Sequence, residues 1–354
     1  MRALVLGGTG AMGRHLVGLL SDGGWSVDVT TRSRGRTGRD GVRYVVGDAH
    51  DGAFLEGILT SADYDAIVDF MVWRTGEFSE VAERLLSGAR QYLFISSYRV
   101  YADAPVLEEG SPRLADVSRD EEYLRTDEYA LAKARCEDVL RRSGRANWTI
   151  ARPGITYDSG GRFQLGVLEA GTWLWRSMHG YQIAMPDELL SKTTTMTSGA
   201  DVARMLCALV GNGAALGEAY NLATSESLPW SEVLEVYRRS LPVAVVPCTL
   251  DQYAWAAQAP YQLFYDRMYD RVVDNSKVLG VAGIGQADLR PARDGLHEAL
   301  CAFLRSGGRV NPPCGTNARI DALTGERCLG DLLRRGRPFS TAAKYAAGRL
   351  RGRV

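Results

Sequence analysis

The chain has 354 residues, of which 45% are hydrophobic and 24% charged, values typical of globular domains long enough to bury a full core. Lys plus Arg and Asp plus Glu each number 42, so the formal net charge is zero and we expect no nucleic-acid partner. The six cysteines and four histidines are scattered, which predicts no metal site. Without a secretion signal or an apolar run of about 18 residues, we expect a cytoplasmic protein with no membrane partner.

The first 150 residues alternate between two hydrophobic patterns. Short apolar runs predict strands at 3–6, 25–30, 42–46, 66–72, 92–96 and 148–152, and helical spacing predicts helices at 12–20, 54–59, 81–86 and 129–142. This alternation indicates an α/β fold, a doubly wound parallel Rossmann sheet. The polar stretch 103–127 predicts a long loop, of the kind that often forms a lid.

Beyond residue 155 the alternation is looser. Helices are predicted at 166–181, 199–210 and 231–240, and a strand at 218–222. We expect a dinucleotide-binding Rossmann domain at 1–155, to which 191–222 returns, a smaller mixed substrate-binding domain at 156–304, and a basic C-terminal extension at 305–354. The extension carries eleven Lys/Arg and three Asp/Glu, so we expect it to be solvated and loosely packed.

A glycine-rich turn joins the first predicted strand to the first helix. Gly7, Gly10 and Gly13 give a G-x-x-G-x-x-G spacing. Glycine lets the backbone approach a pyrophosphate, and the helix N-terminus supplies N–H donors. An ordinary strand–helix turn is the alternative, but the flanking elements favour a dinucleotide site.

The ends of the second and third strands add to this site. Arg32 stands where NAD-binding proteins usually carry an acid, and its guanidinium suits the 2′-phosphate of NADP, with Arg34 or Arg36 as helpers. We therefore expect NADP, with NAD as the alternative. Asp48 could accept a hydrogen bond from the adenine amino group. The alternatives are a solvated arginine and a turn aspartate.

Tyr129 and Lys133 are four residues apart on one predicted helix, and therefore on one face. A nearby ammonium favours the phenolate and makes tyrosine usable as a general acid/base. Ser96 and Ser97 end the fifth strand, where a hydroxyl can hold a substrate oxygen. Each pattern is common by itself.

In this order the motifs, with Arg152-Pro153 after the sixth strand, resemble the extended short-chain dehydrogenases/reductases, the NAD-dependent epimerase/dehydratase family, over residues 1 to about 304. The resemblance implies Ser97, Tyr129 and Lys133 as the catalytic set. The cofactor residues expected are Gly7, Thr9, Gly10, Ala11, Met12, Gly13, Arg32, Asp48, Ala49, Phe70, Met71, Ser96, Tyr129, Lys133, Pro153 and Ile155. The substrate residues expected are Ser97, Tyr98, Tyr157 and Lys192.

Two departures from the family narrow the function. Tyr98 and Arg99 stand where dehydratases carry acids, so dehydration is not expected. The family's arginine for a nucleotide diphosphate is missing near Lys192, which could replace it. We expect NAD(P)-dependent hydride transfer at a hydroxyl or keto carbon of a sugar or sugar-nucleotide-like small molecule, by a homodimer. The alternatives are an NADPH-dependent ketoreductase of a non-nucleotide secondary metabolite and a non-catalytic nucleotide-sensing or RNA-binding protein.

Overall fold

The computed structural model describes residues 1–35, 38, 40–334 and 338–350, and the chain divides into two compact units. Unit 1 comprises Met1–Thr156, Met196–Ser225 and Val273–Arg290. Unit 2 comprises Tyr157–Thr195, Glu226–Val272 and the chain from Pro291 onward. The segment 273–290 therefore belongs with the Rossmann sheet, although the sequence analysis assigned it to the substrate domain. Arg36 lies outside the described residues.

Unit 1 is built on a seven-stranded sheet, in which neighbouring strands pair in parallel. Its strands are β1 (Arg2–Leu6), β2 (Ser26–Thr31), β3 (Val42–Val46), β4 (Tyr64–Asp69), β5 (Ala89–Ile95), β6 (Trp148–Pro153) and β13 (Glu218–Leu222). The spatial order is β13-β6-β5-β4-β1-β2-β3. The chain thus adds β2 and β3 on one side of β1, and β4, β5, β6 and β13 on the other side. This order confirms the predicted doubly wound Rossmann fold.

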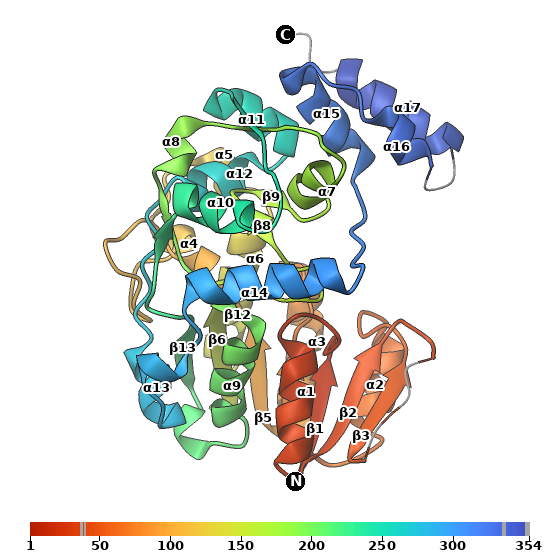
Figure 1. Ribbon diagram of the computed structural model, residues 1–354. Coiled ribbons are helices and arrows are strands. Elements are labelled where there is room, and N and C mark those ends of the chain that lie inside the picture. Colours follow the sequence, from red (N-terminus) through yellow and green to blue (C-terminus); the bar gives the residue numbers. More distant parts are fainter. Residues whose placement is uncertain (36–37, 39, 335–337, 351–354) are drawn as a thin grey trace. The chain divides into compact units, whose positions relative to one another are not determined.

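Helices cover both faces of the sheet. The helices of unit 1 are α1 (Gly13–Asp22), α2 (Gly52–Leu59), α3 (Thr75–Ser87), α4 (Leu114–Val117), α5 (Glu121–Leu124), α6 (Tyr129–Arg142), α9 (Gly199–Leu209) and α13 (Ser276–Ala282), with 3₁₀ turns η1 (Tyr98–Val100), η2 (Gly213–Ala215) and η4 (Gln286–Asp288). On one face α1, α9 and α13 share a core with the sheet, and on the other α2, α3 and α6 do so (Figure 1). Ala3 and Val5 point into the first core, Leu4 and Leu6 into the second. Both faces of β1 are therefore buried, which explains its uninterrupted apolar run.

Two predictions in unit 1 need correction. The stretch 103–127, predicted as a long loop, contains two four-residue helices, α4 and α5, and isolated bridges join Tyr101 to Arg113 and Leu107 to Val273. The fourth strand was predicted to continue to Val72 but ends at Asp69. There the Asp69 side chain accepts a hydrogen bond from the Met71 N–H and turns the backbone out of the sheet.

Unit 2 is a mixed assembly of helices and two-stranded sheets. Its elements are β8 (Gln164–Leu165), β9 (Leu168–Glu169), α7 (Trp173–Met178), β10 (Ile183–Met185), α8 (Asp187–Leu190), β11 (Thr193–Thr194), β14 (Leu228–Pro229), α10 (Trp230–Arg238), β15 (Val245–Pro247), α11 (Leu250–Ala257), α12 (Pro260–Gln262), the π-helical turn η3 (Leu263–Arg267), α14 (Ala292–Arg305), α15 (Cys314–Thr324), α16 (Leu329–Leu333) and α17 (Pro338–Leu350). Where units 1 and 2 join along the chain, β7 (Ile155–Tyr157) pairs with β12 (Met196–Ser198). The helix predicted at 166–181 is limited to α7, because a hairpin of β8 and β9 precedes it.

The C-terminal extension is folded, and the prediction of a loosely packed tail was wrong. Asp321 on α15 is fully buried and pairs with buried Arg176 of α7 at 2.8 Å. Tyr345 of α17 is also buried and donates its hydroxyl to Asp321. The extension therefore contributes to the interior of unit 2, although most of its charges are basic.

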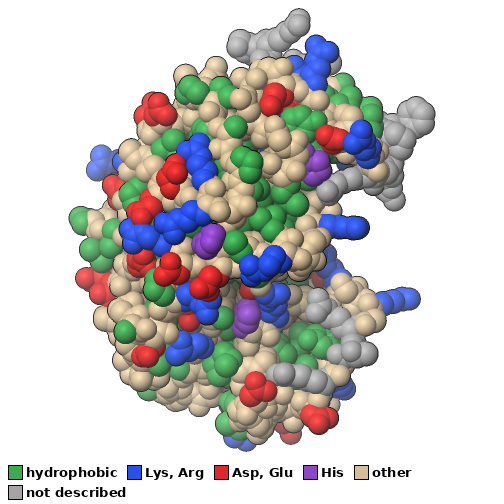
Figure 2. All heavy atoms as spheres, viewed as in Figure 1, with side chains coloured by type: hydrophobic (Ala, Val, Ile, Leu, Met, Phe, Trp, Pro, Cys, Tyr) green, Lys and Arg blue, Asp and Glu red, His purple; other side chains and the backbone are tan. Residues whose placement is uncertain are grey.

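The charges on the viewed face are mixed. Figure 2 shows basic and acidic side chains interspersed there, in agreement with the zero formal net charge. Unit 2 also contains an ion pair between Arg293 and Glu226 at 3.1 Å. Among the described residues, none of the helices combines the length and apolarity that crossing a bilayer requires.

Candidate functional site

The residues expected to bind the cofactor gather at one edge of unit 1. In a parallel sheet the carboxyl ends of all strands meet at one edge, and ligands bind where the strand order reverses. The glycine-rich turn follows β1, Arg32 follows β2 and Asp48-Ala49 follows β3. Phe70-Met71 follows β4, Ser96-Ser97 follows β5, and Pro153 ends β6 with Ile155 two residues beyond. The topology thus brings together residues spread over 150 positions of the sequence.

The glycine-rich turn has the local geometry of a phosphate cradle. Gly7 has a φ of +68°, which favours glycine, and its N–H donates to the Thr30 hydroxyl at 3.0 Å. A Cβ on Gly13 would lie 2.6 Å from the backbone of Gly8, so α1 could not pack as closely with any other residue there. A Cβ on Gly10 would meet nothing within 4 Å. The backbone at Gly10 is therefore open to a ligand, next to the first N–H groups of α1.

Three neighbours of Gly10 complete the turn: Thr9, Ala11 and Met12. The Thr9 N–H donates to the carbonyl of Gly7 at 2.9 Å, and the Met12 carbonyl accepts from the N–H of Leu16 in the first turn of α1. All three side chains are half-buried. The residues present fit the pyrophosphate of a dinucleotide, since they offer an open glycine backbone, a helix N-terminus and no acidic side chain in the first turn of α1.

Charged and polar side chains stand at the next two strand ends. Arg32 is exposed directly after β2. Asp48 is half-buried after β3, and its carboxylate accepts from the His50 N–H at 3.1 Å, which leaves its second oxygen for another donor. Asp28, inside β2, is occupied elsewhere, with Arg2 and Arg43 at 2.8 and 2.7 Å and the Tyr64 hydroxyl at 2.8 Å. Arg32 is thus the charged group that β2 presents at this edge.

Lys133 lies buried at the same edge, although it comes from α6. Its ammonium donates to the carbonyl of Ile95, at the end of β5, at 2.7 Å and to the carbonyl of Met71, after β4, at 3.1 Å. The ammonium also lies 4.5 Å from the centre of the Phe94 ring. Two backbone carbonyls from neighbouring strands therefore fix a cation at the centre of the sheet edge.

Tyr129 lies in the first turn of α6 between two cations. Lys133 Nζ is 5.9 Å and Arg99 Cζ 5.2 Å from the centre of its ring. Arg99 is held by Glu128, the N-cap residue of α6, at 2.6 Å. Two cationic side chains therefore face the ring of Tyr129, whose phenol is a group that can give and take a proton.

The two serines at the end of β5 face different partners. Ser97 caps the turn η1, and its hydroxyl oxygen accepts from the Arg99 N–H at 3.2 Å. The side chain of Arg99 lies over the ring of Tyr129, so Arg99 contacts Ser97 through its backbone and Tyr129 through its guanidinium. Ser96 instead donates its hydroxyl to Glu137 at 2.6 Å, and its N–H to the Ala151 carbonyl at 2.7 Å. Ser96 is buried and connects the end of β5 to α6 and β6, so its side chain serves the structure behind the edge.

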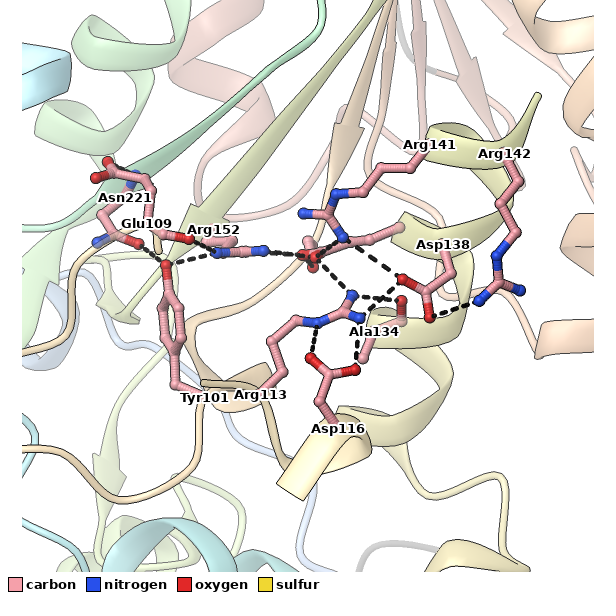
Figure 3. Close-up of polar contacts among 12 residues, drawn as sticks. Tyr101, Glu109, Arg113, Asp116, Ala134, Asp138, Arg141, Arg142, Arg152 and Asn221 are labelled. Carbon is pink, nitrogen blue, oxygen red and sulfur yellow. Dashed lines mark hydrogen bonds and ion pairs between the residues drawn. The ribbon is translucent and has the colours of Figure 1, made fainter. Parts of the chain in front are cut away.

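A buried ionic network lies behind Ser96 (Figure 3). Arg152 donates to both carboxylate oxygens of Glu137 at 2.8 and 2.6 Å and to the Tyr101 hydroxyl at 2.7 Å. Tyr101 in turn donates to Asn221 of β13 at 2.7 Å. Burial by itself raises the pKa of Glu137, but Arg152 and Arg141 outweigh it and lower the pKa. Burial raises the pKa of Tyr101 to about 12, so the phenol stays neutral and keeps its donor.

The expected substrate residues are divided between the units. Tyr98 belongs to unit 1 and is 2% exposed, within η1 beside Ser97. Tyr157 and Lys192 belong to unit 2, where Tyr157 is buried and Lys192 half-buried. The backbone of Lys192 is hydrogen-bonded to Trp230 and Leu189.

Two residues at the edge were not predicted as site residues. In the sequence, Arg99 served only as evidence against dehydration, since dehydratases carry an acid at this position. In the structure Arg99 contacts both Ser97 and Tyr129. Asp69 was visible as the one charged residue of an apolar strand, and it is fully buried beside the peptide that holds Lys133. A charge in an otherwise apolar buried strand is the signal that could have identified it.

Comparison with known proteins agrees with this geometry. Residues 7–212 match a family model described as NAD(P)H-binding. A 2′-dehydrokanamycin reductase of Streptomyces kanamyceticus is 24% identical over 266 residues, which are 73% of this chain and 71% of that protein.

Solved structures share the fold. A putative epimerase from Burkholderia cenocepacia has 19% identity and a TM-score of 0.65, covering 86% of this chain and 98% of its own. The UDP-glucose 4-epimerase of Thermus thermophilus, solved in complex with NAD, has 20% identity and a TM-score of 0.62, covering 86% of this chain and 99% of its own. The predicted resemblance to the extended short-chain dehydrogenases/reductases is confirmed.

Proposed function

This chain belongs to the NAD(P)H-binding family, within the enzymes of the extended short-chain dehydrogenase/reductase type, and on that premise we propose that it reduces a keto group of a sugar-like small molecule with NADPH. The observation that carries the proposal is the position of Lys133. Two strand-end carbonyls hold its ammonium beside the ring of Tyr129 at the carboxyl edge of the sheet. The exposed Arg32 after β2 favours NADPH over NADH.

In this proposal the dinucleotide is held by the glycine turn, Arg32 and Asp48, with Phe70, Met71, Pro153 and Ile155 around its nicotinamide end. When bound, the cofactor supplies the hydride. Ala49, which is buried after β3, would line the adenine side of the cofactor.

The side chains of this protein then handle the oxygen and its proton. Tyr129 gives its phenolic proton to the oxygen that gains charge, and the cations of Lys133 and Arg99 stabilise the phenolate that remains. Ser97 donates its hydroxyl to the same oxygen and orients it, while the Arg99 N–H holds the Ser97 oxygen in place. Dehydratases carry an acid after the catalytic hydroxyl residue, and this chain has Arg99 there. No carboxylic acid at that position can therefore protonate a leaving hydroxyl.

The Streptomyces relative, a 2′-dehydrokanamycin reductase, supports a ketone substrate that is sugar-like but not a nucleotide sugar. Tyr98, Tyr157 and Lys192 are the side chains proposed to contact it. A second candidate is epimerisation, which the names of the two structural neighbours favour. An epimerase retains its cofactor and returns the hydride to the same carbon, whereas a reductase releases NADP⁺ after each turnover.

The first experiment separates these functions. Purified protein is denatured and any released dinucleotide is identified by mass spectrometry. Stoichiometric bound NAD(P) indicates an epimerase, and protein that arrives empty but binds added NADPH more tightly than NADH supports the reductase. Protein that binds neither contradicts both.

The second experiment tests Tyr129. NADPH oxidation is followed with 2′-dehydrokanamycin as the first probe ketone, then with other keto sugars. Tyr129→Phe should lower turnover by about 10²- to 10⁴-fold, the usual contribution of a general acid, and should retain NADPH binding. Tyr220→Phe, on β13, is the matched control and should retain activity. Unchanged turnover in Tyr129→Phe would show that Tyr129 is not the general acid, whereas wild-type protein that binds NADPH but reduces no ketone would favour a non-catalytic, cofactor-sensing role.

A further inference from the structure

Asp69 is a carboxylate in the centre of the Rossmann core, at the last residue of β4. It is 0% exposed. Its oxygens accept three hydrogen bonds, from the Met71 N–H at 2.8 Å, the Trp73 indole N–H at 2.7 Å and the Tyr92 hydroxyl at 2.6 Å. All three donors are neutral. Burying a carboxylate whose three donors include no guanidinium lowers the stability of the fold, and an apolar residue at this position of the sheet would be more stable.

The three hydrogen bonds shape the segment that follows β4. The bond to Met71 turns the backbone out of the strand, and the bond to Trp73 fixes the other end of the segment two residues later. Just before Met71, the Phe70 N–H donates to the Leu6 carbonyl of β1 at 3.0 Å. These bonds hold the segment so that the Met71 side chain lies against the glycine turn, 3.2 Å from where a Cβ on Gly7 would be.

The same peptide meets Lys133. Asp69 binds the N–H of Met71, and the carbonyl of Met71 accepts from the Lys133 ammonium at 3.1 Å. Burial raises the pKa of Asp69 above its ordinary value, although its three donors and the charge of Lys133 act in the opposite direction. The Met71 peptide thus joins the Asp69 carboxylate to the Lys133 ammonium.

We propose that Asp69 is a positioning residue, which holds the Met71 carbonyl where it fixes the Lys133 ammonium beside Tyr129. The inference rests on the proposed function for the role of Lys133, but the geometry can be tested without any substrate. If the hydrogen bonds to Asp69 are weakened, the Met71 carbonyl moves and the ammonium loses one of its two acceptors. Turnover should then fall more than cofactor affinity.

The test uses two buried tyrosines in the same sheet. Tyr92→Phe removes one donor to Asp69. Tyr64→Phe removes a like bond, 2.8 Å long, from a second buried carboxylate, Asp28, and is the matched control. Asp69→Asn is the stronger variant, and Tyr92→Phe keeps the test available where Asp69→Asn does not fold.

The main readout is the NMR signal of the Lys133 ammonium in full-length protein labelled with ¹⁵N-lysine. The chain has only four lysines, Lys133, Lys192, Lys277 and Lys344, so a Lys133→Arg variant assigns the signal. We expect Tyr92→Phe and Asp69→Asn to shift or broaden the Lys133 signal and leave the other three in place, and Tyr64→Phe to change none. An unchanged Lys133 signal in folded Tyr92→Phe and Asp69→Asn would overturn the proposal, as would an equal change in Tyr64→Phe.

The kinetic readout depends on a working probe ketone. With one, Tyr92→Phe should lower kcat by about 2- to 10-fold, as expected for loss of one neutral hydrogen bond, while the NADPH dissociation constant stays within about twofold. A rise in KM with kcat unchanged would contradict positioning of Lys133. If no ketone is reduced, the proposed function fails, and the NMR result still decides whether Asp69 positions Lys133.

Discussion

Two buried arginines, one in each unit, each form an ion pair that joins two segments of the chain, but they do so in different surroundings. Arg152 of β6 and Arg176 of α7 are at most 1% exposed, and each is paired with a fully buried carboxylate. Arg152 meets Glu137, from the helix that carries Tyr129, and ties β6 to it. Arg176 meets Asp321, from the C-terminal extension, and ties the extension to α7.

The comparison teaches that a buried ion pair need not mark a ligand site. Glu137 of the Arg152 pair also accepts a hydrogen bond from the Ser96 hydroxyl. The pair therefore supports the end of β5, where the candidate site lies. The Arg176 pair is accompanied by Glu326 at 2.8 Å and by the N–H of Cys328, which donates to Asp321 at 2.7 Å. These partners all come from α7 and the extension, so this pair fastens a late segment of the chain.

The largest effect is expected from breaking either pair. Arg176→Met leaves the buried carboxylate of Asp321 without its cation, which typically costs about 3–5 kcal/mol of unfolding free energy. Arg152→Met removes the nearest cation of Glu137 but leaves Arg141 and Arg113 at 3.2 and 3.4 Å, so we expect a smaller cost. Hydrogen exchange followed by mass spectrometry should localise the loss, to peptides of α6 and β6 in the first variant and to α15 and α16 in the second. Equal loss of protection throughout the chain in both would contradict the assignment of the pairs to separate units.

A pH dependence sharpens the comparison on the unit 1 side. Because Glu137 has a folded-state pKa below its ordinary value near 4.3, it stabilises the fold above that pH, and the contribution is lost as pH falls through the folded-state pKa. Glu137→Gln should therefore be less stable than wild type at pH 7 and should lose less further stability on acidification. Urea unfolding at several pH values between about 7 and 3 measures this. Parallel curves for the two proteins would contradict it.

An exposed arginine should behave differently from both buried ones. Arg32→Ala should weaken NADPH binding by about tenfold, the equivalent of one charge-assisted hydrogen bond of about 1.4 kcal/mol, with NADH binding and stability unchanged. Arg90→Ala is the control, since Arg90 is exposed at the amino end of β5, away from the carboxyl edge. Titration of NADPH fluorescence measures both. Equal weakening of NADPH and NADH would remove the argument for NADP.

The smallest effect is expected from an exposed pair. Arg125 meets Glu121 four residues earlier at 2.6 Å, with both side chains more than three-quarters exposed. Arg125→Met should change the unfolding free energy by about 0.5 kcal/mol or less, because solvent screens such pairs. A loss comparable to that of Arg176→Met would undermine the distinction between buried and exposed arginines.

The sequence alone determined the Rossmann sheet and the place of its ligand-binding edge. Strands buried on both faces must be continuously apolar, and Gly7, Gly10 and Gly13 allow a backbone that other residues would obstruct. Because each of these requirements concerns residues close together in the chain, it can be recognised in the sequence. The predicted bounds of β3, α6 and β13 therefore agree with the structure.

Only the tertiary structure decided what the charged residues do. Arg99 and Asp69 belong to the site because the fold brings Tyr129 and Lys133, from the distant helix α6, next to them. The residues adjacent to Arg99 and Asp69 in the sequence do not predict these contacts. The C-terminal extension has the composition of a solvated tail. It folds because Arg176, about 145 residues earlier in the chain, provides a buried cation for Asp321, and such a pairing exists only once the chain has folded.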